Sequence, residues 1–213
     1  MAHHPGKNMR FRLLLSGLAA AALLAGCTAS SLVSQQANPE YVGKSFKSVV
    51  VVAVTEDEIV RRTYEDRMVA LLAKRGIKGI PGYAAIGGRG KVQQAALRQG
   101  VAGSNADAVL ITRVTSVDRA KMSISGGTLA VSYGGWGGGY YGFYDGVWDT
   151  VSVGPQVVSG ERWAVTETRL FDARKESLAW VGLVDTKESD NFKAAMTQYV
   201  DIVFDAMVRD RVI

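Results

Sequence analysis

The chain has few of the residues on which many enzyme active sites depend. Among its 213 residues, histidine occurs only as His3 and His4, and cysteine only as Cys27. Beyond the first few residues, therefore, the chain has no Ser-His or Cys-His nucleophile pair and no histidine ligand for zinc. Carboxylates and lysines are left as groups for acid–base catalysis. We expect a non-enzymatic protein with no metal and no cofactor.

Long apolar runs are also scarce. The one run of note extends from Leu13 to Ala25, which is too short for a membrane span of about 20 residues. It follows three basic residues, Lys7, Arg10 and Arg12, and it ends in small residues just before Cys27. A basic start, a short apolar core and small residues before a cleavage site indicate a secretory signal. The alternative is an uncleaved helix with an incidental cysteine.

Leu24-Ala25-Gly26-Cys27 resembles the signal of bacterial lipoproteins. The resemblance implies that residues 1–26 are removed and that Cys27 carries acyl chains such as palmitate, which anchor the protein in a membrane. Thr28 stands where an aspartate would imply the inner membrane, so we expect the outer membrane, with the domain facing the periplasm. Translation could start at Met1 or at Met9.

Loss of the signal changes the charge balance. Residues 1–26 hold three of the 25 basic residues and none of the 20 acidic ones, which leaves 22 against 20 and a formal charge of +2. No basic stripe then remains to indicate nucleic-acid binding. The remaining 187 of 213 residues are enough for one domain with a sizeable core. We place this domain at residues 46–213. Residues 27–45 contain the lipidated cysteine and what we interpret as a flexible tether, or, near Tyr41, a segment wrapped on the surface.

A valine-rich run over residues 48–54 predicts a central strand, followed by a helix. Thr55 and Glu58 have the spacing of a capping box, and Gly76 suits the end of this helix. Its expected apolar stripe is Ile59, Val60, Tyr64, Met68, Leu71 and Leu72. Its charged face is Arg61, Arg62, Glu65, Asp66 and Arg67, which we interpret as solvated, with a binding patch as the alternative.

The order continues with a strand at 77–80, a glycine-rich loop, a helix at 91–99 ended by Gly100, and a strand at 107–117. This β-α-β-α-β alternation predicts a parallel sheet with right-handed crossovers.

An antiparallel hairpin is predicted from strands at 162–171 and 178–186, with Asp172 in its turn. Leu178, Trp180 and Val184 are expected on one face of the second strand. A final helix, capped by Ser189 or Asp190, has the clearest apolar stripe in the chain. The stripe consists of Phe192, Ala195, Met196, Tyr199, Val203, Ala206 and Met207. The fold class is therefore α/β (α+β), with a mixed sheet, a hairpin and a C-terminal helix.

Residues 126–148 hold 9 of the 24 glycines and 7 of the 18 aromatic residues. The segment is interpreted either as a loosely packed loop or hairpin, or as a surface that contacts a partner. The aromatic candidates for contact are Tyr133, Trp136, Tyr140, Tyr141, Phe143, Tyr144 and Trp148. Gly137–Gly142 spells a dinucleotide-binding pattern, but no strand leads directly into it. Asp145, Asp149 and Asp172 are the carboxylates that an enzyme would use.

Three features of the sequence resemble a group of bacterial lipoproteins. They are the valine strand with its capped helix, Asp107–Ile111 after a glycine-ended helix, and Leu170-Phe171-Asp172 paired with Leu178-Ala179-Trp180. Their α/β domain is similar to the TolB amino-terminal domain or the lipoprotein of the curli secretion channel. The resemblance implies envelope assembly or secretion rather than shared catalysis. We therefore expect a periplasm-facing binding module. The alternatives are a subunit of a homo-oligomeric envelope complex and a carboxylate-dependent hydrolase.

Overall fold

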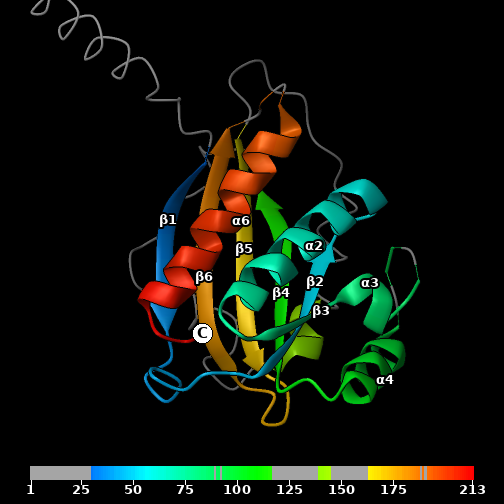
Figure 1. Cartoon of the computed structure of the whole chain (residues 1–213). Helices are drawn as coiled ribbons and strands as arrows, with labels where there is room; N and C mark the ends of the chain where they lie inside the picture. The colour runs from blue at the N-terminus through cyan, green and yellow to red at the C-terminus, as the bar shows by residue number, and fades with distance from the viewer. Residues whose placement is uncertain are drawn as a thin grey trace, which may run out of the picture.

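The computed structural model describes residues 30–88, 90–91, 93–116, 139–144, 163–187, 189 and 191–213. They form one six-stranded mixed sheet in the order β1-β6-β5-β4-β2-β3, with helices on both faces (Figure 1). The strands are β1 (Ser30–Ala37), β2 (Ser48–Val54), β3 (Lys78–Pro81), β4 (Ala108–Ser116), β5 (Trp163–Asp172) and β6 (Leu178–Lys187). The helices are α2 (Glu58–Lys74), α3 (Gly82–Ala85), α4 (Gln94–Ser104) and α6 (Phe192–Arg209).

Strand direction divides the sheet into two parts. β2 runs parallel to both of its neighbours, β3 and β4, whereas β4, β5, β6 and β1 pair antiparallel in turn. The crossovers that parallel pairing requires contain α2 on one side and α3 with α4 on the other. The prediction of a mixed α/β sheet with a hairpin and a C-terminal helix is confirmed.

The valines of β2 explain why the sheet has two cores. Alternate residues of a strand point to opposite faces, so Val49 and Val51 pack under α2 and α6, while Val50 and Val52 pack with α4. All four are at most 3% exposed. Burial of each valine side chain contributes about 1.5–3 kcal/mol, which favours a position between two other strands, β4 and β3, with both faces covered.

The first turn of α2 differs from the prediction. Asp57, not Thr55, is the N-cap, because its Oδ1 accepts hydrogen bonds from the backbone N–H groups of Ile59 (2.8 Å) and Val60 (3.1 Å). The expected place of Ile59 in the core is wrong, since its side chain is 74% exposed. Gly76 follows the helix with a φ of 73°, which confirms it as the residue at which the chain turns away.

The helix predicted at 91–99 begins later and runs further. α4 starts at Gln94, continues through Gly100 and ends at Ser104, followed by the C-cap Asn105 with a φ of 53°. Gly100 is needed for close packing rather than for ending the helix, because a Cβ there would lie 2.6 Å from the carbonyl oxygen of Ala85.

The segment interpreted as a flexible tether contains an ordered strand. β1 pairs with β6, and the hydroxyls of Ser30 and Thr186 share a hydrogen bond of 2.9 Å. Gln35 Nε2 donates to Asp210 Oδ1 (2.7 Å), which joins the strand to the end of α6. Tyr41 is 2% exposed, which agrees with the alternative prediction that the segment near Tyr41 packs on the domain. The tether prediction is therefore wrong for residues 30–45.

The predicted hairpin of β5 and β6 is confirmed, with a difference at its turn. A shift in register after Leu170 moves Leu178 to the α4 face, whereas Trp180 and Val184 share the α6 face. Asp172 holds the turn through hydrogen bonds from the N–H groups of residues 174 (2.8 Å) and 175 (2.9 Å).

The predicted caps of α6 are wrong, as is one member of its stripe. Asn191 is the N-cap, and its Oδ1 accepts a hydrogen bond from the N–H of Ala194 at 3.1 Å. Phe192 precedes the buried part of the stripe and is 44% exposed. In the described part of the chain, no helix is long and apolar enough to span a bilayer.

Candidate interaction surface

The aromatic residues predicted to contact a partner are buried wherever the structure describes them. Tyr140, Tyr141, Phe143 and Tyr144 are 2–9% exposed and belong to the core between the sheet and α4. The rings of Tyr140 and Phe143 lie 6.3 and 5.8 Å from that of Phe171. The prediction of a contact surface is wrong for these four residues, because their rings complete a core.

The other predicted site residues cannot be placed in the same way. Tyr133, Trp136 and Trp148 lie outside the described residues, as do the catalytic alternatives Asp145 and Asp149. The lipidation signal, Leu24-Ala25-Gly26-Cys27, also lies outside them.

Phe143 covers a buried ionic cluster that the sequence did not reveal. Arg113 on β4 and Arg169 on β5 both contact Glu167, with nitrogen–oxygen distances of 2.7 and 2.5 Å. Both guanidinium groups lie over the Phe143 ring, 4.6 and 4.3 Å from its centre. The one signal in the sequence was a row of charged residues inside two predicted strands. Ion pairs and ring contacts of this kind fix the packing of 139–144 on the sheet.

A second buried pair lies on the helix face that we expected to be solvated. Glu65 is fully buried, and its Oε1 accepts hydrogen bonds from Arg61 Nε (3.2 Å) and the N–H of Ala53 (3.1 Å). Its Oε2 accepts from the N–H of Tyr83 at 2.8 Å. Burial raises the pKa of the Glu65 carboxyl, while the two backbone amides and Arg61 act in the opposite direction. The prediction of a solvated face is wrong for this pair, which ties α2 to β2 and α3.

Both carboxylates connect elements of the fold. Glu65 and Glu167 each accept hydrogen bonds from arginine side chains, and Glu65 also accepts them from backbone N–H groups. The third candidate carboxylate, Asp172, holds the hairpin turn. Within the described ranges, no group of three or more His, Cys, Asp or Glu residues could hold a metal ion.

The two edges of the sheet are the remaining candidates for a site, and they differ in protection. β3 is four residues long and contains Lys78 and Pro81, a charge and a residue without an N–H. Short length, lysine and proline are devices that discourage pairing with another chain. β1 is eight residues long, and its sequence, SSLVSQQA, has neither charge nor proline. Among the described residues, the protective feature of this strand is a bulge between Leu32 and Ser34.

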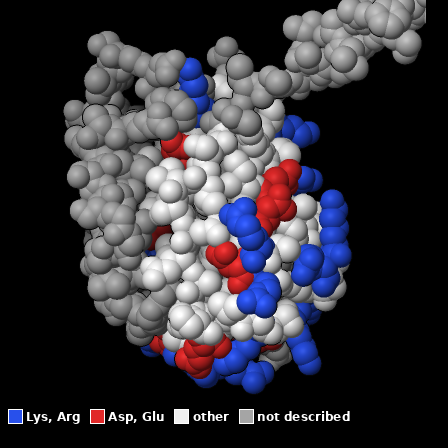
Figure 2. All heavy atoms as spheres, turned by 90° about the vertical axis from the view of Figure 1, so that its left-hand side faces the viewer, with Lys and Arg blue, Asp and Glu red and all other residues white. Residues whose placement is uncertain are grey.

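β1 has a strand partner on one side only, within the part of the chain that the structure describes. Figure 2 looks at this side of the molecule and shows a broad uncharged area in its middle, with acidic and basic groups gathered on the right, toward the helical face, and along the bottom. The outer backbone groups of β1, which have no strand partner among the described residues, can accept a further strand through main-chain hydrogen bonds. Because such bonds need little from the side chains, no motif in the sequence marks this surface.

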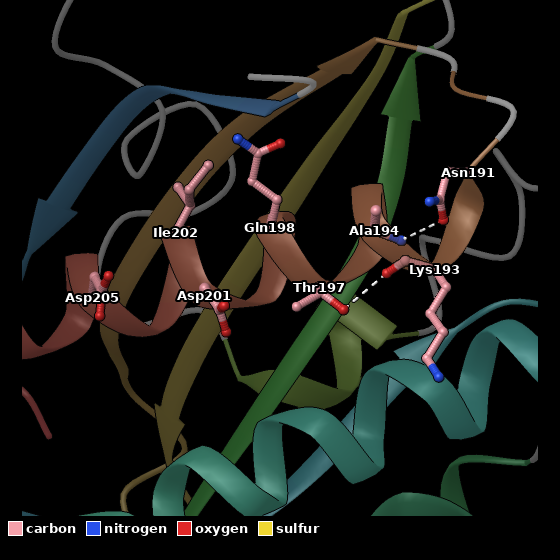
Figure 3. A pocket seen from close by; sticks show the side chains of 8 residues that line it. All are labelled: Asn191, Lys193, Ala194, Thr197, Gln198, Asp201, Ile202 and Asp205. Atoms are coloured by element: carbon pink, nitrogen blue, oxygen red, sulfur yellow. Dashed lines mark hydrogen bonds between the residues drawn. The ribbon is translucent and has the colours of Figure 1, made fainter. Parts of the chain in front are cut away.

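The outer face of α6 continues the surface (Figure 3). It carries a groove of about 560 Å³, lined by Asn191, Lys193, Ala194, Thr197, Gln198, Asp201, Ile202 and Asp205. Gln198 connects the groove to the strand, since its Oε1 accepts a hydrogen bond of 3.2 Å from the N–H of Ser30. On the other side, Asp201 pairs with Arg67 of α2 at 2.7 Å. We call β1 together with this groove the β1 surface.

No protein-family model and no curated protein sequence matches the chain. Among solved structures, the chain is similar to the PelC dodecamer of Paraburkholderia phytofirmans, with a TM-score of 0.44 and 13% identity over 85% of this chain and 97% of that one. It is also similar to lipoprotein GNA1162 of Neisseria meningitidis, with a TM-score of 0.39 and 15% identity over 76% and 98% of the two chains. A DUF330 protein of Xanthomonas campestris has a TM-score of 0.33 and 12% identity, over 81% of this chain and 86% of that one. Likenesses this distant say nothing about function.

Proposed function

We propose that the protein is a non-enzymatic, lipid-anchored module of the bacterial envelope that binds another envelope component through the β1 surface. The observation that carries this proposal is the uncharged, eight-residue edge strand β1. In proteins that must stay monomeric, edge strands of this length are usually protected from pairing with another chain by charged residues, proline or bulges. An edge left open is suited to pairing with a strand of a partner or of a second copy.

The way β1 is held also supports a rigid binding site. The side chain of Ser31 bonds to Asp185 on β6, and Gln35 bridges Asp210 (2.7 Å) and Arg209 (2.6 Å). A strand fixed in this manner is pre-organised, so it loses little conformational entropy on binding a partner. The anchor at Cys27, predicted from the lipoprotein signal, would keep this edge at the membrane.

The absence of enzymatic activity is part of the same proposal. It is supported by the lack of histidine beyond His4 and by the structural roles of Glu65, Glu167 and Asp172. No nucleic-acid partner is expected from a charge of +2 after removal of the signal.

Charges placed on the β1 edge provide the test. Ser34→Lys with Gln36→Lys adds the gatekeeper charges that β1 lacks, without removing a buried group. Gln99→Lys with Ala102→Lys, at exposed positions of α4, adds the same charge elsewhere. We expect the first pair to abolish co-purification of the partner from detergent-solubilised envelopes and the second to leave it intact.

Mass spectrometry of the purified material identifies the partner. A second protein lost only with the β1 variant supports a tethered recognition module. Recovery of the chain with itself, and its loss with the same variant, supports the homo-oligomeric alternative. Equal recovery with both variants would contradict the assignment of the β1 surface.

A further inference from the structure

The predicted lipid anchor lies very close to the folded domain. Cys27 and Ser30, the first residue of β1, are separated by three peptide steps, which span at most about 10 Å. If Cys27 is lipidated, as the proposed function requires, the domain therefore has almost no free linker. The part of the domain nearest the start of β1 must then lie at the bilayer surface.

Several elements begin or end at this part of the domain. β1 begins there, β6 and β4 end there, and α6 begins just beyond it (Figure 1). The register confirms the arrangement, because Leu32 pairs with Val184, Val184 with Thr166, and Thr166 with Val114. β2 also ends at this level, since Val54 pairs with Arg113, and α2 starts four residues later. We call this part of the domain the docking end.

The docking end carries the large apolar side chains that are exposed in the described part of the chain. Among the described residues, four such side chains are exposed: Val33 (38%), Ile59 (74%), Val114 (44%) and Phe192 (44%). Val33 follows Leu32 in β1 and Val114 pairs with Thr166, so both lie in the part of the sheet that forms the docking end. Ile59 and Phe192 occupy the first turns of α2 and α6. The opposite end of the sheet, with the polar β5–β6 turn, has no counterpart to them in the described residues.

The charges at the docking end are compatible with an interface between water and lipid. Lys187 and Lys193 are exposed, and long lysine side chains can reach the headgroups while their stems lie on apolar surface. Of the nearby acids, Asp57 caps α2 and Glu58 pairs with Arg62 at 2.7 Å. Glu56 is exposed, so the two signs are mixed. Apolar contact, more than net charge, would drive the docking.

We infer that the docking end rests on the phospholipid bilayer, with Ile59, Val114 and Phe192 inserted at the level of the headgroups. The β1 strand then runs away from the membrane, because it starts at the docking end. This orientation presents the β1 surface sideways along the bilayer, where a neighbouring envelope protein or a second copy can pair with it.

A depth measurement tests the inference on the lipidated full-length protein. Once Cys27 is acylated, a cysteine introduced at Ile59, Phe192 or Arg174 is the only free thiol, and an environment-sensitive fluorophore can be attached there. Arg174, exposed in the β5–β6 turn, is the control at the far end. The protein is reconstituted in vesicles of phosphatidylethanolamine with a minority of phosphatidylglycerol, with and without a lipid-bound shallow quencher.

We expect blue-shifted emission and quenching for Ile59→Cys and Phe192→Cys, and neither for Arg174→Cys. Raising the salt concentration should leave the difference in place, because the contact is mainly apolar. If the protein floats with the vesicles but all three labels report water, the docking is wrong and the anchor stands. If the protein does not float, or its Cys27 reacts with the dye, the lipid anchor and with it the proposed location fail.

Discussion

Replacement of Glu65 tests a buried contact that joins three elements of the fold, α2, β2 and α3. Glu65→Ala removes the acceptor of three hydrogen bonds, from Arg61 Nε and from the N–H groups of Ala53 and Tyr83. The Arg61 side chain is 7% exposed, so its charge would remain buried without this partner. Removing one member of a buried ion pair typically costs about 3–5 kcal/mol.

The expected loss is large relative to the whole stability of the domain. A domain is stable by about 5–15 kcal/mol, and a urea dependence of about 2 kcal/mol per M converts a 4 kcal/mol loss into a midpoint shift of about 2 M. Urea unfolding of the mature chain with Cys27→Ser, followed by circular dichroism, measures this shift. Glu58→Ala is a matched control on the same helix, because the short contact of Glu58 (2.7 Å) is with Arg62, whose side chain is 54% exposed, while it reaches Arg61 only at 4.0 Å. A surface pair contributes about 0–1 kcal/mol.

The comparison of Glu65→Ala with Glu58→Ala decides whether Glu65 is a structural contact of the core. If Glu65→Ala shifts the midpoint no further than Glu58→Ala, then Glu65 is not the buried tie between α2, β2 and α3. Replacing Arg61 and Glu65 together with leucine should cost less than Glu65→Ala alone, because no charge is then left buried.

Three further predictions follow from single contacts. Burial raises the pKa of Glu65 above its ordinary 4.5, so the folded protein keeps the carboxyl proton to a higher pH than the unfolded chain does. The stability of the wild type relative to Glu65→Gln should therefore fall as the pH rises from 4.5 through the raised pKa. A difference in urea midpoint that does not change with pH would contradict this. Gly182→Ala should lower the stability by about 1–3 kcal/mol in thermal unfolding, since the added methyl group would lie 2.8 Å from Cζ2 of the buried Trp180. Gly103→Ala is the control and should be neutral or stabilising, because no atom lies within 4 Å of the added methyl group. Phe143→Ala should cost about 3–5 kcal/mol in urea unfolding, because the ring is core; a loss below 1 kcal/mol would restore the interpretation of Phe143 as a surface residue.

The fold was predictable where hydrophobic periodicity decides structure. The valines of residues 48–54 and the paired strands of the hairpin lie where the sequence indicated, because strands buried on both faces need apolar residues at successive positions. Helix ends were less predictable. Thr55 and Asp57 are both good caps, and only the path of the chain decides that Asp57 takes this role.

The candidate site was not predictable from residue type. Aromatic residues in a glycine-rich segment suit either a contact surface or a core, and at Tyr140 and Phe143 tertiary packing chose the core. Arg61 and Glu65 resembled a solvated helix face, because nothing in the sequence shows that α3 covers them. The β1 surface depends on which strand lies at the edge of the sheet, and that is a property of topology.

Site-specific crosslinking from β1 tests the central claim most directly. A photoreactive residue at Gln36 in the full-length, membrane-anchored protein reports what lies against the edge strand in the intact envelope, and the same residue at Gln99 on α4 is the control. The account predicts a discrete adduct from position 36, with another envelope protein or with a second copy, and none from position 99. Identical patterns from the two positions, or no adduct from either, would contradict the assignment of β1 as the binding edge.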